Sequence, residues 1–120
     1  MRKLMEAQKV EVPYKEMVLA DGSPNESWLA GLRSSLKAME EKGGEAMLFP
    51  LFTERECKDV DAALEITAAY KHCARRVKDC ASVKGFFVPP VFRDMDRGAE
   101  LVENFKTELL EKHPHYVFAD

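Results

Sequence analysis

The sequence lacks the features that mark membrane spans and secreted disulfide frameworks. No apolar run approaches the roughly eighteen residues of a transmembrane helix. The N-terminus turns acidic at Glu6 before any apolar core begins, so we expect no signal peptide. The three cysteines are odd in number and widely spaced, which does not fit a disulfide scaffold. We therefore expect an intracellular protein with no membrane span.

An excess of positive charge is also missing. The chain carries 18 Lys and Arg against 21 Asp and Glu, a formal net charge of −3. Binding to DNA or RNA depends on basic side chains that neutralise phosphates. The charge balance therefore argues against nucleic acid as the main partner.

Motifs of known catalytic or cofactor-binding sites are absent as well. None of the six glycines belongs to a phosphate-binding loop, and the sequence holds no Cys-x-x-Cys or His-x-x-x-His pair and no recognisable Ser-His-Asp arrangement. His113 and His115 stand near a helix end without the clustered carboxylates or cysteines that zinc requires. Asp94, Asp96 and Glu100 fit the start of a helix better than an acid–base pair. We expect no catalytic residues, no metal and no cofactor, and we lean towards a protein that is not an enzyme.

Cysteine chemistry is the one enzymatic alternative. Cys73 and Cys80 stand two turns apart on one predicted helix, about 10.5 Å between Cα atoms, which is too far for a disulfide. We expect all three cysteines to be buried apolar residues. The alternative is a small α/β thiol or redox enzyme that uses Cys73 or Cys57.

Helix breakers are missing from one long stretch. Residues 53–82 contain neither proline nor glycine, and Thr53-Glu54-Arg55-Glu56 opens the stretch as a capping box. Acidic residues fill its first half and basic ones its second, which matches the helix dipole. The pattern predicts one helix over 54–82. About 28 helical residues span roughly 42 Å, more than the roughly 35 Å diameter of a compact chain of this size. Such a helix would project beyond its own domain and lie against a neighbour.

Two further helices are predicted. Ser23-Pro24-Asn25-Glu26 is a second capping box, and apolar residues from Trp28 to Met39 repeat at helical spacing, so we place a helix over 24–42. A third runs over 96–112, begins after Asp94 or Asp96 as its cap, and ends before Pro114.

Three extended runs lie near residues 46–52, 86–92 and 116–119, and the first two contain proline. Their prolines and their few β-branched residues argue against a sheet. We predict a mainly α fold of about three helices with extended proline- and aromatic-rich connections. Residues 1–22 would form an extended arm or short strands, and 23–120 a single helical domain. The alternative is a small α/β domain with alternating short strands and helices.

Aromatic side chains in these runs are the most suggestive functional feature. Rings in a proline-stiffened segment lose little entropy on docking and suit a protein interface. The expected interface residues are Phe49, Phe52, Phe86, Phe87, Phe92, Tyr116 and Phe118. A basic stripe on the long helix, Lys71, Arg75 and Lys78 with Arg76 beside it, suits either phosphate or an acidic surface, although such a stripe is more often solvated.

The leading hypothesis is therefore a non-catalytic structural subunit of a larger multiprotein assembly. Its partners would be other protein subunits, which the long helix and the Phe/Pro-rich arms would hold in register. An organellar setting such as a mitochondrial respiratory complex fits this hypothesis, but no residue specifies it. Besides the thiol enzyme, the alternative is a regulatory domain whose Phe86–Phe92 segment docks into a partner's groove.

Overall fold

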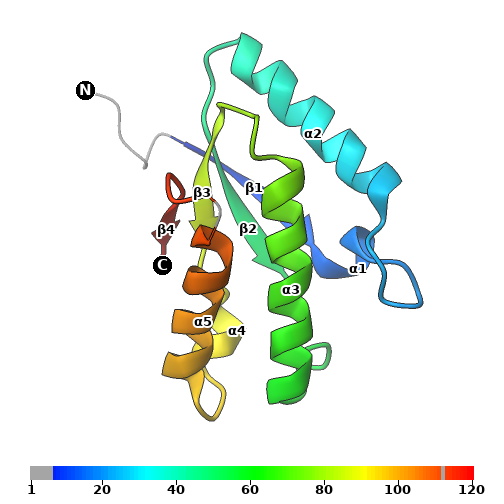
Figure 1. Cartoon of the computed structure of the whole chain (residues 1–120), viewed down its shortest axis with the longest axis vertical. Coiled ribbons are helices and arrows are strands. Elements are labelled where there is room, and N and C mark those ends of the chain that lie inside the picture. Colours follow the sequence, from blue (N-terminus) through cyan, green and yellow to red (C-terminus); the bar gives the residue numbers. More distant parts are fainter. Residues whose placement is uncertain (1–6, 112) are drawn as a thin grey trace.

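The computed structural model describes residues 7–111 and 113–120, and it shows a parallel β-sheet with helices between its strands (Figure 1). The sheet has the order β1-β2-β3-β4, and all three neighbouring pairs are parallel. Its strands are β1 (Gln8–Pro13), β2 (Ala46–Leu51), β3 (Val83–Phe87) and β4 (Val117–Ala119). The helices are α1 (Tyr14–Met17), α2 (Glu26–Glu41), α3 (Val60–Arg76), α4 (Pro90–Arg93) and α5 (Gly98–Leu110).

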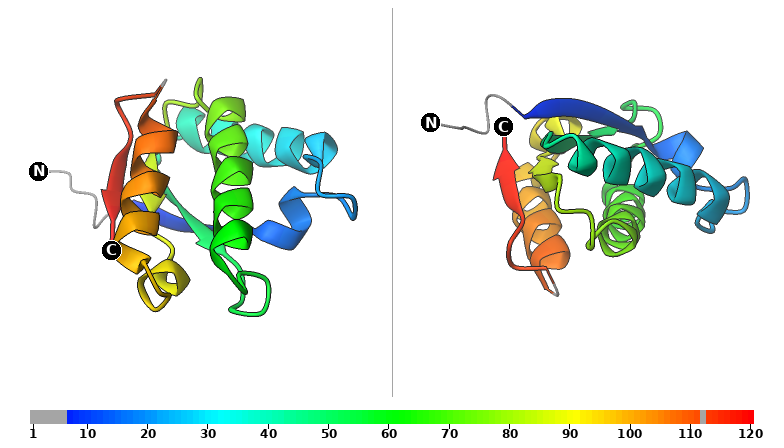
Figure 2. Two further views of the ribbon diagram at one scale, coloured as in Figure 1. Left: turned by 60° about the horizontal axis from the view of Figure 1, so that its bottom comes forward. Right: turned by 90° about the horizontal axis from the view of Figure 1, so that it is seen from above.

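The three long helices lie on the same side of the sheet. Each crossover between parallel strands is normally right-handed, and here every crossover steps to the next strand in the same direction. Such a series places every connecting helix on one face. The right-hand view of Figure 2 shows α2, α3 and α5 on the same, inner side of the curved sheet that runs from β1 to β4. The other face of the sheet carries no helix from the described part of the chain.

The prediction of a mainly α fold is wrong, because the extended runs pair into this four-stranded sheet. The α/β alternative describes the molecule. The proline in β2 does not prevent the sheet: Pro50 lies beyond Leu48, where the paired register with β3 ends, so its missing N–H costs no bond to that strand. Pro13 ends β1, which is an edge strand. In the second run, residues 86–92, Pro89 and Pro90 follow β3 and begin α4, which the sequence did not predict.

The single helix expected over 54–82 is also wrong. The capping box forms, since Thr53 Oγ1 accepts from Glu56 N–H and a Glu56 carboxylate oxygen accepts from Thr53 N–H. It closes only a turn, because Asp59 is fully extended (φ −156°, ψ 179°) and caps a new helix by accepting from Ala62 N–H at 2.8 Å. The helix α3 then ends at Arg76.

The split removes the geometric problem that the long helix posed. The 17 residues of α3 span about 25 Å, and the molecule measures 40 × 32 × 24 Å. No part of α3 needs to project beyond its own domain. It packs between the other elements, beside α5 and along α2.

The other two helices are close to their predicted bounds. The first begins two residues late, because Asn25 and not Ser23 is its cap: Asn25 Oδ1 accepts from Trp28 N–H, while Ser23 bonds to Asp21. The last begins at Gly98 after Arg97, which adopts a left-handed conformation (φ 62°) and provides no side-chain cap. The predicted caps Asp94 and Asp96 are therefore not used. Residue 112, the predicted end of this helix, and residues 1–6 of the predicted arm lie outside the described residues.

The core fills the space between the helices and the covered face of the sheet. Large, fully buried side chains come from every layer: Val12, Leu48 and Phe86 from strands, with Leu36, Ile66, Tyr70 and Phe105 from helices. Two buried tyrosines bond to backbone carbonyls, Tyr70 Oη to Val12 at 2.6 Å and Tyr116 Oη to Ala74 at 2.9 Å. Burial of apolar area therefore supplies most of the stability on this side of the sheet.

Candidate functional site

The helix-free face of the sheet is the first candidate site, and strand register defines its residues. Paired residues of parallel strands point to the same side. Lys9 pairs with Met47, Glu11 with Phe49, and Pro13 with Leu51. Across the rest of the sheet, Met47 pairs with Gly85, which pairs with Val117, and Phe87 pairs with Ala119. We call the surface made by Lys9, Glu11, Met47, Phe49, Leu51, Phe87, Val117 and Ala119 the open face. Met47, at its centre, is only 2% exposed.

Apolar side chains dominate the open face. Leu51 is 38% exposed and Val117 40% exposed. Phe49 and Phe87 are half-buried and meet edge to face, with ring centroids 5.5 Å apart. None of these four belongs to the core cluster, which contains their neighbours Leu48 and Phe86 on the opposite side. The Phe49–Phe87 contact therefore lies on the open face and is not part of the core.

Charge on the open face is balanced and confined to β1. The Lys9 ammonium lies over the Phe49 ring, 4.2 Å from its centroid, which is a cation–π contact. Glu11 is the next residue of this face along β1 and is exposed. One positive and one negative group leave the centre of the face neutral. An apolar partner fits such a surface better than a charged ligand does.

The structure separates the predicted interface residues. Phe52, Phe86, Phe92 and Tyr116 are buried in the core, where their rings contact one another or their neighbours. Phe118 is partly buried against Phe105 of α5. Only Phe49 and Phe87 reach the open face. Sequence reasoning missed Lys9, Glu11, Leu51 and Val117, although the alternation Lys9-Val10-Glu11-Val12 signals which side of β1 is polar.

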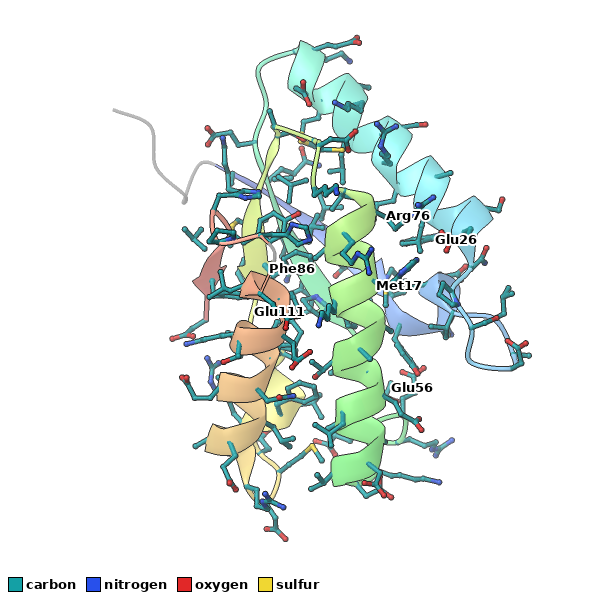
Figure 3. All side chains as sticks on the ribbon, in the orientation of Figure 1. Met17, Glu26, Glu56, Arg76, Phe86 and Glu111 are labelled. Carbon is teal, nitrogen blue, oxygen red and sulfur yellow. The ribbon has the colours of Figure 1, made fainter. Side chains whose placement is uncertain are left out.

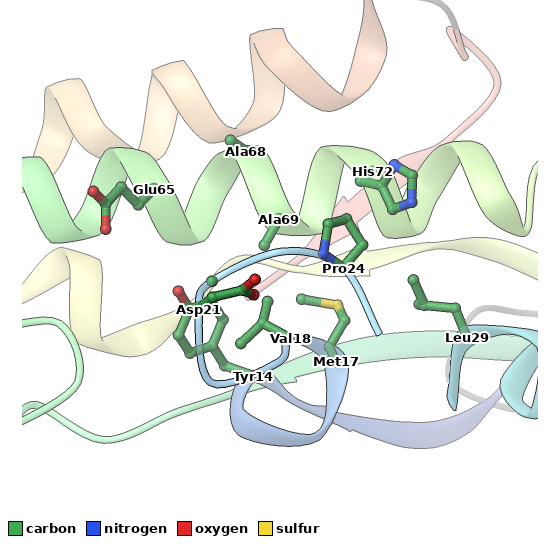
Figure 4. A pocket seen from close by; sticks show the side chains of 11 residues that line it. Tyr14, Met17, Val18, Asp21, Pro24, Leu29, Glu65, Ala68, Ala69 and His72 are labelled. Carbon is green, nitrogen blue, oxygen red and sulfur yellow. The ribbon is translucent and has the colours of Figure 1, made fainter. Parts of the chain in front are cut away.

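A pocket beside α3 is the second candidate. It has a volume of about 460 Å³ and lies between α3, α1 and the loop that leads to α2 (Figure 4). Small or apolar residues, among them Met17, Ala68 and Ala69, form much of its wall. Its size lies in the usual range of small-molecule sites.

The polar groups of this pocket are a phenol, a histidine and two carboxylates. Burial, and then the negative charges of Glu65 and Glu56, raise the pKa of Tyr14. Hydrogen bonds from the Ser23 side chain and backbone lower the pKa of the Asp21 carboxyl. His72 Nε2 lies 2.9 Å from a Glu26 oxygen. Among the described residues, no serine, threonine or cysteine lines the pocket.

The cysteines are placed for packing. All three are buried. Burial raises the pKa of the Cys73 thiol to about 12, and burial, with a smaller effect of Asp59, raises that of Cys57. A raised pKa keeps the thiol protonated near neutral pH, where it is a poor nucleophile. Cys57 Sγ lies 3.3 Å from Met95 Sδ, under the turn that precedes α3.

The remaining predicted groups do not assemble into a metal or catalytic site. His113 and His115 have ring centroids 6.4 Å apart, and within residues 7–111 and 113–120 no three His, Cys, Asp or Glu side chains are grouped to hold a metal ion. The basic stripe divides: Lys71 binds Glu108 and Glu111 of the α5 side, while Arg75, Arg76 and Lys78 line a pocket on the α2 side. Glu100 pairs with Arg97.

Comparisons with protein-family models, with curated proteins and with solved structures found no match to this chain. None of the described helices has both the length and the apolar character needed to cross a lipid bilayer. The geometry of the chain itself therefore carries the functional argument.

Proposed function

We propose that this chain is a non-catalytic subunit of a multiprotein assembly, and that another protein chain packs on the open face of its sheet. All-parallel sheets are found almost only where both faces are covered. Here the three long helices of the described residues lie on one face, and no described helix covers the other. The exposure of Leu51 and Val117 on that bare face is the observation that carries the proposal.

The helix-free face of the sheet, and not a long helix, is the reason to expect a neighbouring chain. Because α3 lies within its own domain, no projecting helix requires a neighbouring chain to cover it. The apolar residues on the helix-free face of the sheet do require one. The organellar setting stays a prediction of the sequence, because no described residue bears on it.

The dimensions of the open face favour a different chain over a second copy. Four strands about 4.8 Å apart, of six, six, five and three residues, give a footprint of roughly 300 Å². A stable interface buries about 800 Å² on each partner. Two such faces stacked on each other fall short of that area. A different chain that also contacts the β1 edge or the flanking loops reaches it.

The alternatives have less support. The buried cysteines with raised pKa values do not suit a thiol enzyme. The segment Phe86–Phe92 is poorly suited to docking into a partner, because the rings at its two ends, Phe86 and Phe92, are fully buried in the core.

The test compares charged substitutions on and off the open face. The variant Leu51→Lys with Val117→Lys places two charges on this face, and Leu19→Lys with Leu64→Lys places two on exposed apolar residues elsewhere. Each tagged chain is expressed in the cells it comes from and the native extract is run on a sizing column. We expect the wild type and the Leu19/Leu64 control to elute well above 13.6 kDa, and the open-face variant to elute as a monomer with an unchanged melting temperature.

A photocrosslinking amino acid at Leu51 or at Leu64 identifies the contact directly. An adduct of one discrete mass from position 51 and none from position 64 is expected. Elution of the wild type as a free monomer in the extract overturns the proposal. A stable homodimer of the purified chain replaces the different chain with a second copy.

A further inference from the structure

The pocket between α2 and the end of α3 gathers positive charge in a chain whose net charge is negative. It has a volume of about 480 Å³ and is lined by four basic side chains and one carboxylate. These residues, with the one hydroxyl among them, are Arg33, Ser34, Arg75, Arg76, Lys78 and Asp79. They come from two segments more than forty residues apart in sequence.

Hydrogen bonds fix the walls of this pocket. The loop that follows α3 is tied to α2, because Arg33 Nε donates to an Asp79 carboxylate oxygen at 3.1 Å and Lys37 Nζ donates to the Asp79 carbonyl at 2.7 Å. Further along the loop, Ala81 N–H donates to the Glu40 carboxylate at 2.8 Å. Ser82 Oγ donates to the Leu36 carbonyl, also at 2.8 Å. These hydrogen bonds therefore hold α2 and the loop after α3, which carry the basic side chains, in a fixed relative position.

Two of the four positive charges have no partner within residues 7–111 and 113–120. Arg33 forms a two-pronged pair with Asp79. Arg76 Nε lies 3.1 Å from a Glu26 oxygen, and Figure 3 shows these two side chains next to each other between α3 and α2. Arg75 and Lys78 form no ion pair with any described residue. Arg33 has five N–H donors and uses two of them in its bonds to Asp79, so three remain for a ligand.

The dipole of α3 explains only part of this arrangement. Basic residues in the last turn offset the partial negative charge of a helix C-terminus, about half a unit. That accounts for Arg75 and Arg76, but it does not account for Arg33 and Ser34, which come from α2. Lys78, which lies beyond the end of α3, adds an unpaired charge that the dipole does not require.

We propose that this pocket binds the phosphate group of a small, non-aromatic molecule. Guanidinium groups with a hydroxyl beside them recognise phosphate oxygens through charge-assisted hydrogen bonds. No aromatic side chain lines the pocket, so nothing is present on which a nucleotide base could stack. A phosphorylated sugar or alcohol fits both its volume and its chemistry. The proposal is independent of the partner on the open face.

Backbone amide shifts of the purified full chain test the proposal. Inorganic phosphate and glycerol 3-phosphate are titrated at constant ionic strength, with glycerol as the uncharged control. Both phosphates are expected to shift the amides of residues 30–34 and 75–79 with saturation, and glycerol is expected to shift none. Shifts that never saturate, or that lie elsewhere, overturn the proposal.

A pair of variants with the same change in charge separates a site from general attraction. Arg75→Gln with Lys78→Gln removes the two unpaired charges, and Arg55→Gln with Lys58→Gln removes two exposed charges before α3. The first pair is expected to weaken glycerol 3-phosphate binding about tenfold or more, which corresponds to about 1.4 kcal/mol or more for the two lost charges together. The second pair should change it less than about twofold. Equal weakening in both variants overturns the site.

Vesicles distinguish a soluble phosphate from a lipid headgroup. Phosphatidylcholine vesicles with phosphatidic acid are sedimented with the protein in parallel. Co-sedimentation without any response to glycerol 3-phosphate assigns the basic residues to a membrane surface and overturns the proposal. A response to glycerol 3-phosphate without co-sedimentation supports it.

Discussion

The two faces of the sheet are built from neighbouring residues that differ in what they contact. Phe86 and Phe87 are adjacent in β3, yet Phe86 is fully buried against Tyr116 while Phe87 meets Phe49 at the surface. The covered face is a closed core in which the Tyr70 hydroxyl donates to the Val12 carbonyl. The open face has the composition of a core without its cover. One sheet therefore uses similar side chains for stability on one face and, in our proposal, for association on the other.

The largest expected effect comes from the adjacent pair itself. Truncation of a fully buried ring costs about 3–5 kcal/mol, so Phe86→Ala should lower the free energy of unfolding by that amount. Phe87→Ala should lower it by about 1 kcal/mol, because the ring leaves a half-exposed surface. Urea unfolding of both variants measures the difference. Equal losses mean that the open face is as well packed as the core.

Gly85 gives the next largest effect, and it concerns how β4 joins the sheet. A Cβ built at Gly85 lies 1.8 Å from the Val117 carbonyl oxygen, so no side chain fits there without moving β4. Gly85→Ala should cost about 1–3 kcal/mol, as overpacking does. Gly31→Ala is the matched control, since its Cβ meets nothing within 4 Å. That change lies inside α2 and should stabilise the protein by up to about 1 kcal/mol. A Gly85→Ala variant as stable as the wild type would show that β4 packs differently.

The last prediction concerns how the free energy of unfolding depends on pH through the covered side of the sheet. Burial raises the pKa of Cys73, on the covered side, from an ordinary value of 9.0 to about 12. Above pH 9 the unfolded chain releases a proton that the folded chain keeps, so this group makes stability fall as pH rises from 9 towards 12. The slope for one group is at most about 1.4 kcal/mol per pH unit. Buried Tyr70 and Tyr116, whose pKa values are also raised, act in the same direction.

Cys73→Ala isolates the cysteine contribution. Its unfolding free energy, measured in urea at several pH values between 8 and 11, should be lower than that of the wild type at pH 8, because the change leaves a cavity. It should also fall less steeply with pH than that of the wild type. Identical slopes would mean that Cys73 is accessible to solvent in the folded protein.

Local signals in the sequence predicted the helices well where they were unopposed. The apolar repeat from Trp28 to Met39 places α2 within two residues at its start and one at its end. The stretch 53–82 failed because two caps compete there. Thr53 caps only a turn. Asp59, whose backbone is extended, caps the helix α3. Between the two caps, Cys57 enters the core and contacts Met95. Sequence alone does not show which cap the tertiary contacts favour.

The candidate site was harder to predict than the fold. Residues 46–52 are apolar throughout, so β2 carries no alternation to show which of its sides a helix covers. Phe49 and Phe52 look equivalent in the sequence, and only the sheet separates them. The basic pocket needs Arg33 and Arg75 together, and nothing local links residues so far apart.

The order of the strands also bears on how the chain folds. Each strand pairs with the next one in the sequence: Gln8 with Ala46, Ala46 with Val83, and Gly85 with Val117, at separations between 32 and 38 residues. Closing loops of such similar length costs nearly the same entropy each time. The sheet can therefore grow one β–α–β unit after another from either end, without first bringing the two termini together. For a parallel sheet, that is a comparatively fast route to the native state.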